Sequence, residues 1–180
     1  MEIVKYGNPV LRTKGARIGT ITDEIRQLAA AMIETMNAAN GVGLAAQQVG
    51  YALQLAIVDV EGVDDRPSVM RIDGKEVVID EWMPMVLVNP VLELGKDKEF
   101  GTEGCLSFPE ISAEIQRSLV VQVKAQLIDG REVAFEAEGF LSRALQHEVD
   151  HLNGILFIDR MNSATKASLS GKLKRLLKRG

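Results

Sequence analysis

Two histidines four residues apart, His147 and His151, enclose Glu148 in the pattern His-Glu-x-x-His. On a helix, residues at this spacing lie on one face, one turn apart, so both imidazoles can reach a single metal ion. A metal ion lowers the pKa of its bound water, and a nearby carboxylate can take the released proton. The pattern therefore predicts a hydrolytic metal site, although two unrelated histidines on a surface helix would also satisfy it.

A third ligand has to come from elsewhere in the chain. There is no third histidine and no glutamate after Glu148, and Asp159 is expected in a solvated turn. Cys105 is the single cysteine and lies among turn-forming residues upstream of an expected strand. A lone cysteine is usually a small buried hydrophobe, but a thiolate and two imidazoles with one open position form a catalytic metal set. The sequence therefore predicts Cys105, His147 and His151 as the ligands.

A glycine-containing segment runs from Gly41 to Gln48. It formally satisfies a dinucleotide-binding pattern, but it follows an expected helix rather than a strand, so that interpretation is rejected. Two others remain. The segment is either a simple helix stop and turn, or a backbone that passes close to a ligand, with Gln48 as a neutral amide donor to a developing oxyanion.

The elements that must position these residues can be predicted from periodicity and turn residues. Helices are expected over residues 22–40, 140–153 and 163–177, strands over 53–60, 85–92, 119–128 and 132–137, and a hairpin over 64–82 with strands at 69–72 and 76–79. Residues 3–12 are expected to form an extended arm. Strands dominate the middle of the chain without βαβ alternation, which predicts an α+β fold with antiparallel sheets around the His-Glu-x-x-His helix and a helix towards each end.

Composition restricts the class of protein. The chain has 180 residues, the length of one domain, and 46% of them are hydrophobic. The net charge of −4 gives no general case for nucleic-acid binding, so no DNA partner is expected. One cysteine cannot form an internal disulfide, which indicates a reducing compartment. No secretory signal and no apolar run near about 20 residues is present, so a cytoplasmic protein without a membrane span is expected.

Three segments, which follow one another in the family's order along the chain, resemble the peptide deformylase family. They are the glycine segment ending at Gln48, the run Glu103-Gly104-Cys105-Leu106-Ser107, and the run from Gln146 to Gly154. The arm ending Pro9-Val10-Leu11-Arg12 also looks like the start of the family, so the resemblance covers nearly the whole chain. It implies one catalytic domain over residues 1–180. It also implies a hydrolase that removes the formyl group from the N-terminal formylmethionine of new polypeptides and releases formate.

The resemblance also implies roles for individual residues. Cys105, His147 and His151 would bind one divalent ion, Fe²⁺ in the cell, with Zn²⁺, Ni²⁺ or Co²⁺ as substitutes in purified protein. Glu148 would serve as general base and then general acid. The remaining implied roles are oxyanion stabilisation by Gln48 and the Leu106 N–H, backbone contacts to the peptide from Gly43 and Gly104, and a methionine pocket walled by Phe140, Ala144 and His147. Gln47 stands where proline or threonine is common, so either glutamine could be the donor, and alignment favours Gln48.

The C-terminal segment 166–180 combines a leucine stripe with six lysines and arginines. It is either a solvated amphipathic helix docked on the core or a basic helix that binds ribosomal RNA near the exit tunnel. Two rival functions remain open, a zinc endopeptidase and a non-catalytic, ribosome-associated metal-binding protein. Formate release from formyl-Met-Ala, lost in Glu148→Ala, would separate all three.

Overall fold

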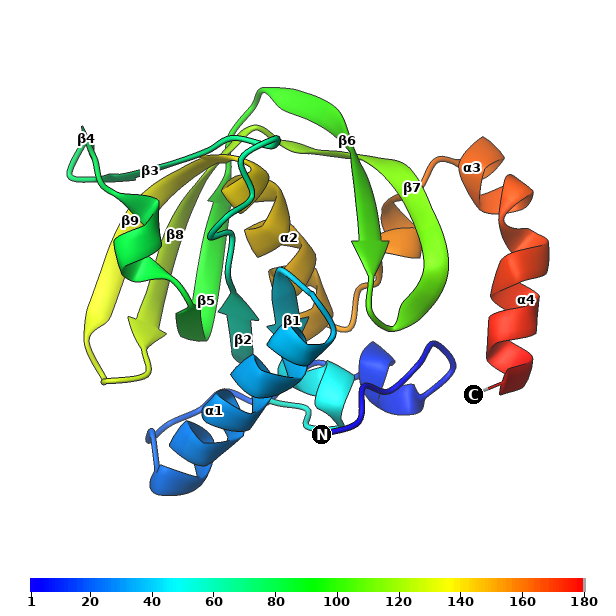
Figure 1. Cartoon of the computed structure of the whole chain (residues 1–180), viewed down its shortest axis with the longest axis horizontal. Coiled ribbons are helices and arrows are strands. Elements are labelled where there is room, and N and C mark those ends of the chain that lie inside the picture. The colour runs from blue at the N-terminus through cyan, green and yellow to red at the C-terminus, as the bar shows by residue number, and fades with distance from the viewer. Residues whose placement is uncertain (180) are drawn as a thin grey trace.

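The computed structural model describes residues 1–179, which form two antiparallel sheets and the helices that cover them (Figure 1). The helices are α1 (Asp23–Ala38), α2 (Phe140–Leu152), α3 (Ser163–Ser168) and α4 (Ser170–Arg179). The strands are β1 (Gly43–Ala45), β2 (Leu55–Val58), β3 (Ser68–Ile72), β4 (Lys75–Glu76), β5 (Met85–Leu94), β6 (Lys98–Cys105), β7 (Phe108–Ser118), β8 (Val120–Leu127) and β9 (Glu132–Gly139). Short 3₁₀ turns occupy Pro9–Arg12, Ala46–Val49, Ile79–Trp82 and Phe157–Arg160.

Seven strands form the larger sheet in the order β1-β2-β5-β8-β9-β3-β4, and β6 and β7 pair separately as a long hairpin. Every pair in both sheets is antiparallel. In Figure 1, α2 lies between the larger sheet and the β6–β7 hairpin, α1 lies below, and α4 covers the outer side of the hairpin. The predicted α+β class with antiparallel sheets is therefore confirmed.

The two long helices owe their boundaries to local signals. The Thr22 hydroxyl accepts a hydrogen bond from the Ile25 N–H at 3.4 Å and caps α1. Asn40 follows α1 with a φ of 56°, which reverses the chain. Beyond α2, Gly154 adopts a φ of 73°, a conformation that suits glycine and ends the helix. These signals lie next to the residues they affect, which is why the sequence predicted both helices to within two residues.

The apolar face of α2 explains its position between the sheets. Leu141 and Leu145 are fully buried and pack with Met70, Phe135 and Ala137 of the larger sheet in one hydrophobic cluster. Burial of such side chains stabilises the packed helix by about 1.5–3 kcal/mol for each large residue. Because α2 is amphipathic, this packing directs its opposite face, which carries both histidines, towards the β6–β7 hairpin.

The β6–β7 hairpin was not predicted. Along β6, only Glu103 is buried, and two glycines interrupt the strand, so no apolar alternation appears. Along β7, buried and exposed residues do alternate, but the last buried residue of the alternating series is Arg117, which is charged. Alternation identifies a strand only where the inward positions are apolar. Cys105, expected in a turn before a strand, is instead the last residue of β6.

Three smaller expectations also differ from the structure. The C-terminal helix divides into α3 and α4, with Leu169 between them. The second strand of the 64–82 hairpin is limited to Lys75–Glu76, because the chain enters a 3₁₀ turn at Ile79. The N-terminal arm ends in a 3₁₀ turn at Pro9, a residue whose restricted φ favours the first position of such turns. None of the described helices is long and apolar enough to cross a membrane.

Candidate active site

Cys105, His147 and His151 meet where the end of β6 faces α2. The Cys105 Sγ lies 3.4 Å from the His151 Nε2, and the potential ligand atoms of the three residues lie within 4.8 Å of one another. Within residues 1–179, no other group of three or more histidine, cysteine, aspartate or glutamate side chains is arranged this way. One sulfur and two imidazole nitrogens at this spacing fit a single divalent transition-metal ion.

The Glu148 carboxyl is buried beside this cluster and is not neutralised by a basic side chain. It is 5% exposed, and its Oε2 has no hydrogen-bond partner within the described chain. Burial raises the pKa of Glu148 to about 7. A carboxyl with a pKa near neutrality can both accept and return a proton, which suits general acid–base chemistry.

Gly43 explains how β1 can lie so close to that carboxyl. A Cβ atom built at this position would overlap with the Glu148 Oε1. The family resemblance implies that Gly43 offers its backbone to a peptide. The structure adds a packing reason for the glycine, because any side chain there would displace the Glu148 carboxyl.

The two histidines are held differently. The His147 Nδ1 lies 2.9 Å from the Glu103 Oε1, which leaves its Nε2 to face the cluster. Burial lowers the pKa of His147, but hydrogen bonds with Cys105 and Glu103 outweigh it and the pKa is raised well above its usual value. Burial holds the pKa of His151 well below its usual value, so that ring is neutral, the form that binds metals.

Behind His147 lies a buried network of charged side chains centred on Glu103. Its carboxylate accepts hydrogen bonds from Arg117 at 2.8 and 2.9 Å and from Arg143 at 2.8 Å. Arg117 also donates to Asp150 at 2.7 Å. Burial raises the pKa of Glu103, but the bonds from Arg117 and His147 outweigh it and hold the pKa far below its usual range. The network thus presents a permanently charged carboxylate to the His147 ring.

Sequence reasoning assigned no role to these network residues, although a signal for them exists. Arg143 precedes His147 by one helical turn, on a helix whose residues from 141 to 148 are all buried. Arg117 continues the inward alternation of β7. A charged residue at a position where periodicity predicts burial needs a partner of opposite charge, and Glu103 is that partner for both arginines.

The structure places the two adjacent glutamines on opposite sides of their backbone. The Gln48 Nε2 lies 3.6 Å from the Cys105 Sγ and donates to the Ser107 Oγ at 3.2 Å. The Gln47 Nε2 instead lies 3.3 Å from each of the Thr13 and Leu152 carbonyl oxygens. Of the two, only the Gln48 amide lies beside the cysteine.

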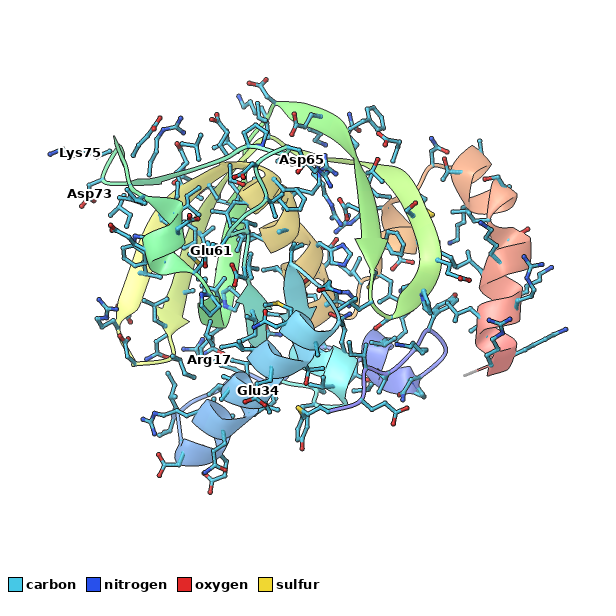
Figure 2. The ribbon with its side chains drawn as sticks, viewed as in Figure 1. Arg17, Glu34, Glu61, Asp65, Asp73 and Lys75 are labelled. Atoms are coloured by element: carbon cyan, nitrogen blue, oxygen red, sulfur yellow. The ribbon has the colours of Figure 1, made fainter. Side chains whose placement is uncertain are left out.

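A cavity of about 620 Å³ opens in front of the cluster. Of the predicted site residues, it is lined by Gly43, Gln48, Gly104, Cys105, Leu106, Phe140, Ala144, His147 and Glu148, while His151 lies behind them. The guanidinium of Arg66 lies 4.3 Å above the centre of the Phe140 ring at the cavity wall. Figure 2 labels Glu61 and Asp65 on the same loop between β2 and β3, which passes beside the start of α2.

Asp159, the remaining candidate ligand considered from the sequence, is not part of the cluster. Its carboxylate binds the Arg12 guanidinium, with contacts of 2.5 and 3.1 Å, and accepts the Leu156 N–H at 2.9 Å. These bonds connect the N-terminal arm to the turn after α2. Residues 1–179 therefore offer no acidic third ligand of the kind that an endopeptidase site would use.

Comparisons with known proteins agree on one family. Residues 1–167 match the model of the family described as polypeptide deformylase. The chain is 46% identical over 180 residues to a peptide deformylase of Methylacidiphilum infernorum, covering 100% of this chain and 94% of the relative. It is 41% identical over 182 residues to one of Opitutus terrae, with coverages of 99% and 93%. The crystal structure of Arabidopsis thaliana peptide deformylase 1B with an inhibitor superimposes with a TM-score of 0.83 at 35% identity, covering 99% of this chain and 91% of that one.

Proposed function

Since the chain belongs to the polypeptide deformylase family, we propose that it removes the formyl group from the N-terminal formylmethionine of new polypeptides and releases formate. The reaction would take place in the cytoplasm, with residues 1–180 acting as one catalytic domain. The observation that carries the proposal is the arrangement in one cavity of Cys105, His147 and an unpartnered Glu148 carboxyl beside the Gln48 amide.

Cys105, His147 and His151 would hold one divalent ion, with Fe²⁺ as the working metal and Zn²⁺, Ni²⁺ or Co²⁺ as substitutes. When bound, such an ion supplies Lewis-acid chemistry, polarising a carbonyl and lowering the pKa of water. The fit rests on the donor set and on the neutral His151 ring. The Glu103 carboxylate orients His147 by its bond to Nδ1, the arrangement that fixes a metal-binding imidazole.

The chain's own residues account for the remaining steps. Glu148 would take a proton from the attacking water and return it to the departing amine, since its pKa of about 7 permits both directions. The Gln48 Nε2 and the Leu106 N–H would donate to the oxyanion that develops on the formyl oxygen. Phe140 and Ala144 would enclose the methionine side chain in the cavity, and the backbones of Gly43 and Gly104 would bind the peptide main chain.

Formate release from formyl-Met-Ala tests the proposal. The purified, metal-loaded protein should release formate and leave internal peptide bonds intact, and Glu148→Ala should reduce turnover by about 10³-fold or more while retaining the metal. Glu61→Ala, at an exposed glutamate of the β2–β3 loop, is the matched control and should keep full turnover. Cleavage of internal bonds would indicate an endopeptidase. A metal-loaded protein that releases no formate would indicate a non-catalytic role.

Removal and replacement of the metal tests the cofactor separately. A chelator should abolish turnover, and Fe²⁺ or Zn²⁺ should restore it. The Fe²⁺ form should lose activity in air, because Cys105 is partly exposed and a thiolate beside ferrous iron is open to oxidation. Equal activity of the iron form after prolonged exposure to air would contradict the predicted oxygen sensitivity.

The basic helix α4 would provide a contact to ribosomal RNA near the exit tunnel. Leu173 and Leu176 are buried against the core, so the helix is docked, while Lys174 and Lys178 are exposed. Lys174→Gln combined with Lys178→Gln should weaken salt-dependent ribosome binding and spare turnover of a short formyl peptide. Unchanged ribosome binding in the double variant would contradict this contact.

A further inference from the structure

The N-terminal arm passes beside both groups that would stabilise the oxyanion. Val4 donates its backbone N–H to the Gln48 carbonyl at 2.8 Å, and Tyr6 donates its own to the Ser107 carbonyl at 3.0 Å. Between these two bonds, the Lys5 Nζ donates to the Leu106 carbonyl at 3.3 Å. Three consecutive arm residues thus bind the backbone of Gln48, Leu106 and Ser107.

The segments that hold Gln48 and Leu106 come from distant parts of the chain. Gln48 belongs to the 3₁₀ turn Ala46–Val49, whereas Leu106 and Ser107 form the turn between β6 and β7. The bond from the Gln48 Nε2 to the Ser107 Oγ, 3.2 Å long, connects them through side chains. The Gln48 side chain is also held within its own segment, because its Oε1 accepts the Ala45 N–H at 3.0 Å, whereas Leu106 and Ser107 connect the paired ends of β6 and β7.

The arm is itself well anchored, which allows it to hold other segments in place. Ile3 packs against the cluster around α1, while Val4 and Tyr6 pack against the cluster around β7. The Tyr6 ring stacks on Phe108 with their centres 4.7 Å apart. The arm therefore bridges the two parts of the molecule that carry the two donors.

The distance between the donors matters for the reaction. Oxyanion donors act only when they lie about 2.7–3.1 Å from the developing charge, so a small displacement of either removes much of its effect. The bond from the Lys5 ammonium to the Leu106 carbonyl is 3.3 Å long and has a charged donor, and bonds with a charged donor are generally stronger than neutral ones. Its acceptor, the Leu106 carbonyl, belongs to the peptide unit that directly follows the Leu106 N–H.

We propose that residues 3–6 set the separation of the two oxyanion donors, and that Lys5 is a positioning residue that orients the backbone at Leu106. The proposal rests on the proposed function, because the donors have a role only in that reaction. Lys5 acts through Leu106 and touches neither substrate nor metal. Loss of the ammonium lets the turn between β6 and β7 rotate, which moves the Leu106 N–H away from the oxyanion without affecting the metal ligands.

The test compares Lys5→Met and Lys5→Arg in the full-length, metal-loaded protein. Methionine keeps the apolar stem and removes the charge, and arginine keeps the charge. Lys14→Met is the matched control, because Lys14 is exposed and makes no side-chain hydrogen bond or ion pair within residues 1–179. The measurements are kcat and KM for formyl-Met-Ala, metal per chain, and the midpoint of thermal unfolding.

For Lys5→Met we expect kcat to fall about tenfold, a part of the 10²–10³-fold effect of losing one donor outright. KM, metal content and unfolding midpoint should stay at wild-type values, and Lys5→Arg should recover most of kcat. A kcat unchanged in Lys5→Met would overturn the proposal, as would a loss that accompanies lower metal content or a lower midpoint. If the wild-type protein released no formate, the proposed function itself would fail, which is a separate result.

Discussion

Helices α2 and α4 are both amphipathic, but their polar faces meet opposite environments. On α4, Leu173 and Leu176 face the core, and the basic side chains face solvent. On α2, both the apolar face and most of the polar face are buried, including Arg143, His147 and Glu148. Periodicity therefore identifies the apolar side of a helix but does not show what covers the polar side.

The β6–β7 hairpin covers the polar face of α2. It thereby changes the hydration and the pairing energy of the polar groups beneath it. A charge on the outer face of α4 is solvated and needs no partner. A charge under the hairpin has lost its hydration and must be paired, which is why Glu103 and Arg117 form a pair with side chains only 5% and 4% exposed. Such a pair adds little net stability as a unit, but loss of one member leaves a buried charge.

Removal of Glu103 should give the largest effect. Glu103→Ala leaves Arg117 and Arg143 buried without their shared carboxylate, so we expect a loss of about 3–5 kcal/mol in the free energy of unfolding, measured by urea denaturation. Lys174→Ala on the solvated face of α4 should change it by less than about 0.5 kcal/mol. Equal losses in the free energy of unfolding for the two substitutions would contradict the distinction between the buried polar face of α2 and the solvated polar face of α4.

Gly43→Ala should act on catalysis. The added Cβ would displace the Glu148 carboxyl, and we expect turnover to fall about 10²-fold or more, a loss within the range for a general base. Gly19→Ala is the control, because Gly19 is exposed, lies outside the cavity, and no atom lies within 4 Å of a Cβ added there. That variant should stay within a few-fold of wild type. A fully active Gly43→Ala protein would show that the contact with Glu148 is unimportant.

Leu173→Ala should weaken α4 without affecting the site. The side chain is 7% exposed in the cluster around β7, so we expect a loss of about 2 kcal/mol in the free energy of unfolding. Turnover per folded molecule should not change. Leu177→Ala, at a leucine that is 46% exposed, should cost well under about 1 kcal/mol. A loss of turnover in folded Leu173→Ala would show that α4 contributes to the site.

The smallest effect should come from Asp159, in the turn that leads from α2 towards α3. Burial raises its pKa, but the bonds from Arg12 and the Leu156 N–H outweigh it and lower the pKa below its usual value. A carboxyl with a lowered folded pKa stabilises the fold above its unfolded pKa and loses this contribution as pH falls through the folded pKa. Wild type should therefore be slightly more stable than Asp159→Asn at pH 7, and the difference should shrink below about pH 4. A difference in the free energy of unfolding that is independent of pH would contradict this origin.

Much of the fold could be predicted because its signals are local. The Thr22 cap and Asn40 bound α1, Gly154 ends α2, and β-branched residues mark two strands of the larger sheet and alternation marks two more. The β6–β7 hairpin could not be predicted, because the one buried position of β6 holds Glu103 and the buried series of β7 ends in Arg117, so charges stand at inward positions of both strands. Those charges are stable there only because partners from α2 meet them, and a local pattern carries no information about such partners.

The same division holds for the candidate site. The sequence by itself determined that His147, Glu148 and His151 share one helix, because helical spacing is a property of neighbouring residues. It also singled out Cys105 and Gln48 by residue type. Three further contacts depend on the folded chain: Gln48 rather than Gln47 lies beside the cysteine, Gly43 packs on Glu148, and Glu103 joins His147 to two arginines. These contacts join segments far apart in the chain, and burial and pairing energies depend on what surrounds a residue in space.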